Sequence, residues 1–156
     1  MKTIHTWLAE YGESHRNPVN KKIHFACVPL IMVSLIGLLW SAPVPAALEA
    51  LPISLNWAVL FLLLALGYYV ALSPSLTVGM VFVAVGLAGA SYGLDRIGDP
   101  KLWQISAAIF AVAWIGQFVG HKIEGARPSF FKDLQFLMIG PLWILGNIYR
   151  RLGIKY

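Results

Sequence analysis

Four long apolar runs constrain this chain more than any other feature of its sequence. They are 17 to 19 residues long and cover residues 23–40, 56–72, 76–94 and 102–120. A helix of roughly 20 predominantly apolar residues crosses a bilayer. The composition agrees, because 58% of the residues are hydrophobic and only 12% are charged. We therefore predict one all-α integral membrane domain, residues 1–156, with four transmembrane helices.

Two shorter segments predict helices at the membrane surface. Residues 2–13 place apolar side chains on one face and most of their charges on the other, which is typical of an interfacial helix. Residues 134–148 are too few to span confidently and are interrupted by Gly140 and Pro141, so we expect an interfacial or re-entrant helix. Four tryptophans predict an aromatic belt at the interfaces: Trp40, Trp57, Trp103 and Trp143.

Two pairs of glycines have the spacing that lets helices approach closely. Gly89 and Gly93 lie in the third run, and Gly116 and Gly120 lie in the fourth. Each pair predicts a close contact with another helix.

The positive charges predict the orientation of the chain. With four spans and both termini on one side, that side collects ten of the twelve Lys and Arg residues, leaving Arg96 and Lys101 on the other. The positive-inside rule then makes both termini cytoplasmic, in a bacterial inner membrane or the endoplasmic reticulum. Because the basic residues flank apolar runs and form no basic stripe, we expect contact with membrane lipids and none with nucleic acid. Residues 1–20 have no continuous apolar core, so we expect no cleaved signal peptide.

Two polar clusters lie where apolar runs begin and end. The first cluster begins before the first apolar run and extends into it, and the second cluster lies at the end of the fourth run. Asn17-Pro18, within the first cluster, also predicts the start of a helix. The predicted topology brings both clusters to the cytoplasmic surface. The residues concerned are His15, Asn17, Asn20 and His24 in the first cluster, and Gln117, His121 and Glu124 in the second.

Imidazole and carboxylate groups together suit Fe(II) or Zn(II) better than Mg²⁺ or Ca²⁺. We predict that the metal ligands and catalytic residues are His15, His24, His121 and Glu124. Around them we expect residues that orient a ligand or bind substrate, namely Tyr11, Asn17, Asn20 and Gln117. The alternative is that all of these are interfacial polar groups hydrogen-bonded to helix ends.

Two motifs carry a resemblance to a known family over nearly the whole chain. The first is Tyr11-x3-His15-x-Asn17-x2-Asn20-x3-His24-x4-Pro29, and the second is Gln117-x2-Gly120-His121-x2-Glu124-x3-Pro128. This pattern resembles the small membrane-protein family that includes the fungal endoplasmic-reticulum 2-hydroxy-fatty-acid dioxygenase. The resemblance implies an iron-dependent α-oxidation, with metal-binding histidines that match His15, His24 and His121. Glu124 also matches the motif.

The predicted function is therefore an Fe(II)-dependent dioxygenase that shortens a 2-hydroxy fatty acid by one carbon, with O2 as co-substrate and release of CO2. One alternative is a zinc-dependent lipid hydrolase with Glu124 as general base. Another is a non-enzymatic membrane scaffold or carrier. The sequence predicts no oligomeric state.

Overall fold

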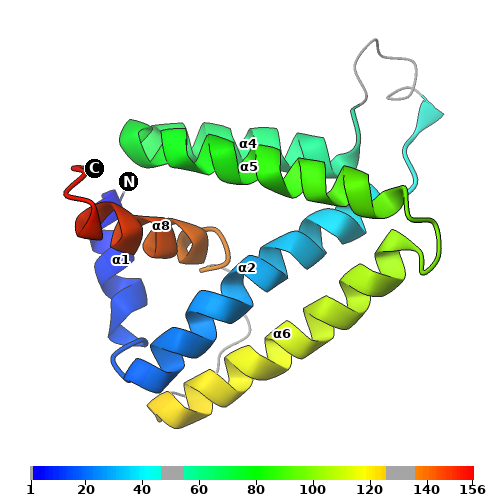
Figure 1. Ribbon diagram of the computed structural model, residues 1–156. Coiled ribbons are helices and arrows are strands. Elements are labelled where there is room, and N and C mark those ends of the chain that lie inside the picture. Colours follow the sequence, from blue (N-terminus) through cyan, green and yellow to red (C-terminus); the bar gives the residue numbers. More distant parts are fainter. Residues whose placement is uncertain (1, 47–54, 126–135) are drawn as a thin grey trace.

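The chain folds into two pairs of longer helices that are inclined to each other, with two shorter helices at one end (Figure 1). The computed structural model describes residues 2–46, 55–125 and 136–156. Within these ranges there are six helices and no strands, which confirms the all-α prediction. The helices are α1 (Ile4–Glu13), α2 (Pro18–Trp40), α4 (Trp57–Leu72), α5 (Pro74–Asp95), α6 (Leu102–Glu124) and α8 (Ile139–Arg151).

Three of these helices are long and apolar enough to cross a membrane. α2, α5 and α6 have 22 or 23 residues each, about 33–35 Å at 1.5 Å per residue, against a hydrocarbon core of about 30 Å. α4 is apolar but has only 16 residues, so the fourth span stays a prediction. α2 begins at Pro18, which confirms the helix start predicted at Asn17-Pro18. α2 and α6 extend beyond the predicted span limits of 23 and 120, so that both polar clusters lie largely on helices.

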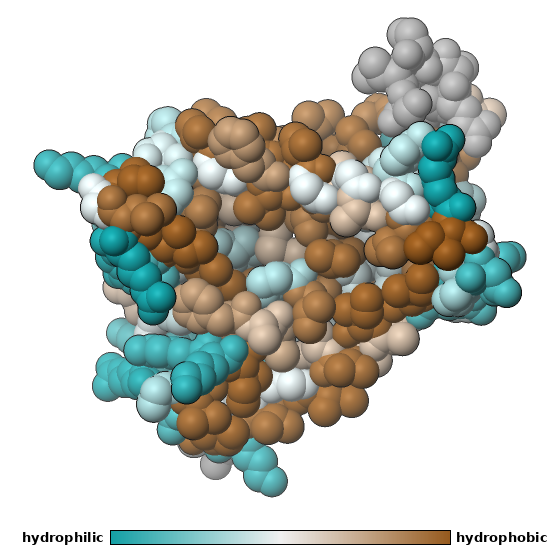
Figure 2. All heavy atoms as spheres, in the orientation of Figure 1, coloured by the Kyte–Doolittle hydropathy of each residue, from teal (hydrophilic) through white to brown (hydrophobic). Residues whose placement is uncertain are grey.

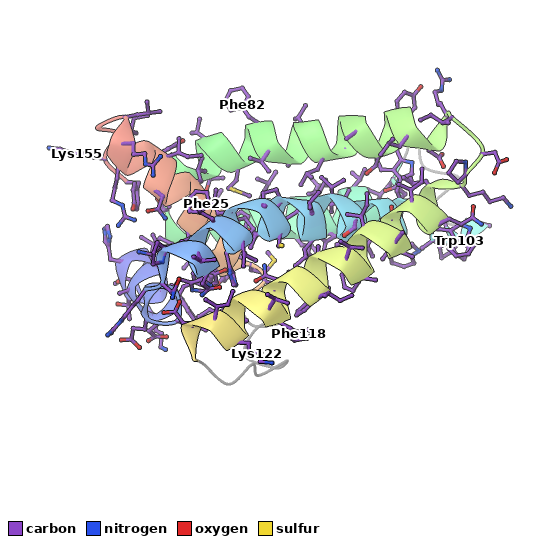
Figure 3. The ribbon with its side chains drawn as sticks, turned by 60° about the horizontal axis from the view of Figure 1, so that its bottom comes forward. Phe25, Phe82, Trp103, Phe118, Lys122 and Lys155 are labelled. Carbon is purple, nitrogen blue, oxygen red and sulfur yellow. The ribbon has the colours of Figure 1, made fainter. Side chains whose placement is uncertain are left out.

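The long sides of the molecule are apolar and exposed. Hydrophilic residues gather toward its two ends, while hydrophobic ones cover much of the length between them (Figure 2). Phe82 and Phe118 point away from the helices (Figure 3), and their exposed fractions are 75% and 41%. Water-soluble monomers rarely expose contiguous apolar surface on this scale. The surface therefore suits contact with lipid tails.

α1 and α8 pack against each other at the end of the molecule where both termini lie (Figure 1). The predicted 134–148 helix is observed as Ile139–Arg151, and residues 134 and 135 lie outside the described ranges. The expected interruption at Gly140 and Pro141 is wrong. Pro141 stands in the first turn of α8, where a missing N–H breaks no helical hydrogen bond.

α2 and α6 form the most extensive helix pair, and glycines on both helices permit it. A methyl group added at Gly116 would lie 2.6 Å from Cys27 Sγ, and one at Gly120 would overlap the Asn20 side chain. The predicted close contact at Gly116 and Gly120 is therefore confirmed. At Gly89 and Gly93, no atom of the described residues comes within 4 Å of an added methyl group, so the close approach that this pair permits is not used there.

The α2–α6 contact can be tested far from the histidines at Gly37. A methyl group there would overlap Ser106 Oγ and lie 3.3 Å from Leu102 Cδ1. We expect Gly37→Ala to lower the melting temperature in detergent by about 3–10 °C, since overpacking costs roughly 1–3 kcal/mol. Gly89→Ala is the matched control and should leave the melting temperature unchanged or slightly raised. Equal melting temperatures for the two variants would contradict the packing described here.

Candidate functional site

The two polar clusters meet in the structure, and three histidines lie side by side. The ring centres of His15 and His24 are 4.1 Å apart, those of His24 and His121 are 4.9 Å apart, and those of His15 and His121 are 5.8 Å apart. All three side chains are buried, with exposed fractions of 3%, 2% and 7% in chain order. The predicted convergence of residues about a hundred positions apart is thus observed.

Local structure explains how each histidine is positioned. His15 lies in the turn between α1 and α2, which ends where the Asn17 side chain accepts hydrogen bonds from the N–H groups of Val19 and Asn20. His24 follows on α2. His121 lies on α6, directly after Gly120, whose missing side chain lets α6 come close to α2 at this level.

Backbone carbonyls fix the orientation of two of the rings. His15 Nδ1 lies 2.5 Å from the carbonyl oxygen of Tyr11, and His24 Nδ1 lies 3.1 Å from that of Asn20. A carbonyl oxygen only accepts, so Nδ1 must carry the proton in each ring. In the neutral imidazole the lone pair then resides on Nε2. Metal-binding histidines are held in the same way, by donating their other N–H to a carbonyl or carboxylate.

Glu124 joins α6 to the start of α2. Its Oε1 accepts hydrogen bonds from the backbone N–H of Arg16 at 2.7 Å and of Asn17 at 3.1 Å. Its Oε2 accepts from the N–H of Asn17 and from Nδ2 of Asn20, both at 2.9 Å. The carboxylate therefore lies at the positive end of the α2 dipole and satisfies donors that have no partner within the helix. These contacts give Glu124 a positioning role, and its predicted role as a metal ligand stays a prediction.

Of the four residues predicted to surround the ligands, three make contacts that support the cluster. Tyr11 stacks on His15, with ring centres 4.2 Å apart and planes 9° apart. Asn20 is fully buried and also donates to the carbonyl of Ser14 at 3.0 Å. Asn17 caps α2 as described above. Gln117 is buried on α6, one turn before His121.

Trp143 is a site residue that the sequence analysis missed. The prediction that it belongs to an interfacial belt is wrong, because its side chain is only 6% exposed. Its ring centre lies 5.3 Å from that of His15 and 5.4 Å from those of Tyr11 and Phe25. No sequence signal connects α8 with the histidines, since the packing of α8 on α1 and α2 brings them together.

The donor atoms are of the right type for a transition metal but are not yet arranged around one point. His15 and His24 meet edge to face, with an angle of 81° between their planes. Among the residues that the structure describes, no group of three or more His, Cys, Asp or Glu side chains forms a ready coordination site.

Comparison with known proteins identifies the family. The sequence model of the family described as "2-hydroxy-palmitic acid dioxygenase Mpo1-like" matches residues 1–152. The chain is 30% identical over 153 residues to the 2-hydroxy-palmitic acid dioxygenase MPO1 of Saccharomyces cerevisiae, and the match covers 96% of this chain and 82% of the yeast protein. No solved structure matches the chain. The resemblance inferred from the two motifs is thereby confirmed, and this chain belongs to the Mpo1-like family.

Proposed function

We propose that this protein is an Fe(II)-dependent dioxygenase that converts a 2-hydroxy fatty acid to the fatty acid one carbon shorter. The observation that carries the proposal is the buried cluster of His15, His24 and His121, in a chain whose yeast relative is named a 2-hydroxy-palmitic acid dioxygenase. The proposed reaction is RCH(OH)COOH + O2 → RCOOH + CO2 + H2O. It balances without a further reductant, because the acid gives up the four electrons that O2 accepts.

The three histidines would hold the iron. Imidazoles bound to one ion through bonds of about 2.1 Å have ring centres roughly 5 Å apart, and the observed separations of 4.1, 4.9 and 5.8 Å bracket this value. Two of the rings already present Nε2 as the nitrogen with the lone pair, as shown by the carbonyl contacts of His15 and His24. When bound, Fe(II) would supply activation of O2 and orientation of the hydroxy acid.

The surrounding residues prepare this cluster in three ways. Tyr11 holds His15 through both its ring and its carbonyl oxygen. Glu124 and Asn20 hold α6 against the start of α2, so that His121 stays beside His24. The burial of all three imidazoles limits the access of bulk water. Gln117, one turn from His121, would orient an imidazole or donate an amide N–H to the substrate carboxylate at the reaction step.

A small apolar cavity of about 30 Å³ lies between the helices. Side chains from α2, α4, α5 and the start of α8 line it, and they include Met32, Met80 and Met138. Methionine side chains adapt readily to a flexible apolar ligand. Met32 is eight residues beyond His24 on α2, so about 12 Å separates the histidines from the pocket along the helix. A volume of about 30 Å³ holds only about two water-sized groups. An acyl chain anchored near the histidines would therefore extend into this cavity only by displacing the flexible methionine side chains.

Iron content should depend on the three clustered histidines and not on the fourth. We expect protein purified in detergent without chelator to contain near-stoichiometric iron. His15→Ala, His24→Ala and His121→Ala should each lower that content at least tenfold, because each variant removes a ligand. His5→Ala is the matched control, since His5 stacks on Tyr156 outside the cluster. Elemental analysis gives the metal content, and O2 consumption with 2-hydroxypalmitate gives the activity.

Other outcomes of that experiment would overturn the proposal. Stoichiometric zinc, with lipid hydrolysis that continues without O2, would identify a hydrolase. No metal after anaerobic reconstitution with Fe(II) would leave the histidines a structural role only, as expected for a scaffold or carrier.

Glu124→Gln separates a positioning role from a ligand role. The amide nitrogen would face N–H groups that now donate to a carboxylate, so we expect a loss of about 1–3 kcal/mol in stability and a lower melting temperature. Iron content per folded protein should be largely retained. Glu10→Gln, which breaks only the exposed pair of Glu10 with Lys2, should change the melting temperature little. Iron loss at an unchanged melting temperature would instead make Glu124 a ligand.

We also propose that both termini face the cytoplasm, in a bacterial inner membrane or the endoplasmic reticulum. Reporter tags at residues 1 and 156 should then give the same cytoplasmic signal. Opposite signals would mean that an odd number of helices crosses the membrane.

A further inference from the structure

A wide pocket opens at the end of the molecule beside the histidines. It lies between α1, α2 and α8, and its volume is about 590 Å³, within the usual range for ligand pockets. His15 contributes to its lining, as do Phe25 and Trp143. Phe25 lies between α2 and α8 in Figure 3. The pocket therefore provides a path from the surface to the candidate active site.

Four basic side chains surround this pocket. Lys21 and Lys22 come from the first turns of α2, while Arg150 and Arg151 come from the last turn of α8. The part of the lining that the structure describes includes no Asp or Glu. Four like charges around one concave surface, without a carboxylate to balance them, create a local positive potential that attracts anions.

Helix stability accounts for only two of these charges. Arg150 and Arg151 lie at the negative end of the α8 dipole, where cations are favourable. Lys21 and Lys22 are the fourth and fifth residues of α2, where the helix dipole does not stabilise a cation. The positive-inside rule would place lysines on this side of a membrane, but it does not require them to line a pocket with His15 in its wall.

Two hydrogen bonds along α8 connect Arg150 with Trp143, the residue that packs against His15. Arg150 Nη2 donates to Asn147 Oδ1 at 2.7 Å, and Asn147 Nδ2 donates to the carbonyl of Trp143 at 2.8 Å. Trp143 packs against His15, with ring centres 5.3 Å apart. The guanidinium is therefore held in a defined place relative to His15. A guanidinium also binds a carboxylate through two parallel hydrogen bonds, which no ester or alcohol can reproduce.

We propose that this basic pocket binds the carboxylate of a long-chain fatty acid and so selects free acids over esters. The charged side chains receive the carboxylate, and the apolar walls at Phe25 and Trp143 cover the first methylene groups. The inference rests on the proposed function and deepens it, because it names residues that choose the substrate before the reaction. It requires no metal.

The double variant Lys22→Gln/Arg150→Gln tests the pocket by binding alone. Radiolabelled palmitate, which lacks the 2-hydroxyl group, and its methyl ester are titrated against protein in phosphatidylcholine nanodiscs. We expect the Kd for palmitate to rise about tenfold or more and the Kd for the methyl ester to stay unchanged. Iron content should also stay unchanged. Arg96→Gln/Lys101→Gln is the matched control at the other end of the molecule, and it should bind both ligands like the unaltered protein.

The same measurements decide between a fatty acid and a lipid headgroup as the source of the anion. If unaltered protein in neutral nanodiscs shows no preference for palmitate over its ester, the proposal is overturned. A response of the variant that appears only when phosphatidylglycerol is present would overturn it as well, in favour of headgroup binding.

Measurements of enzymatic activity distinguish a failure of this proposal from a failure of the proposed function. The protein could prefer acids in a charge-dependent way and yet fail to oxidise 2-hydroxypalmitate. That result would support the proposed pocket and refute the dioxygenase. Oxidation with the same KM in the double variant would support the dioxygenase and refute the pocket. If both proposals hold, KM rises about tenfold while kcat changes little.

Discussion

The contact between Glu124 and the start of α2 is the interaction on which the site depends. A single carboxylate accepts hydrogen bonds from two backbone N–H groups and the Asn20 side chain, across more than a hundred positions of sequence. Because these donors stand at a helix N-terminus, the negative charge is also favoured by the α2 dipole. The turn that holds His15 is thereby fixed to the helix that holds His121. Together with the close packing at Gly116 and Gly120, this contact sets the depth of α6 relative to that turn.

Much of the fold was predictable from the sequence, because long apolar runs are compatible with few structures other than membrane-spanning helices. The helical class, the start of α2 at Asn17-Pro18 and the close approach at Gly116 and Gly120 all follow from local spacing. Gly89 and Gly93 show the limit of that reasoning. Small residues permit a close contact, but whether a neighbour is present depends on the arrangement of the whole molecule.

The part of the candidate site that depends only on the order of the helices was predictable from the sequence. His15, His24 and His121 meet because each lies at the same end of a helix pair, and the order of the apolar runs already indicates this. The role of Glu124 was harder, since a carboxylate near imidazoles suits a metal as well as a helix end. The contact of Trp143 with His15 could not be predicted, because it depends on how α8 packs against α1 and α2. The sequence of a short helix such as α8, with Pro141 in its first turn, does not indicate which helices it packs against.

The exposed apolar sides of the molecule have a consequence for how a substrate would arrive. Phe82, Val85 and Val112 are 75%, 67% and 67% exposed, as suits a surface in contact with acyl tails. A long-chain acid dissolves in the same bilayer and diffuses in two dimensions. If such an acid is the substrate, as proposed, its mole fraction among the lipids would govern its encounter with the histidines. Two membranes with equal amounts of acid but different amounts of lipid would supply this protein at different rates.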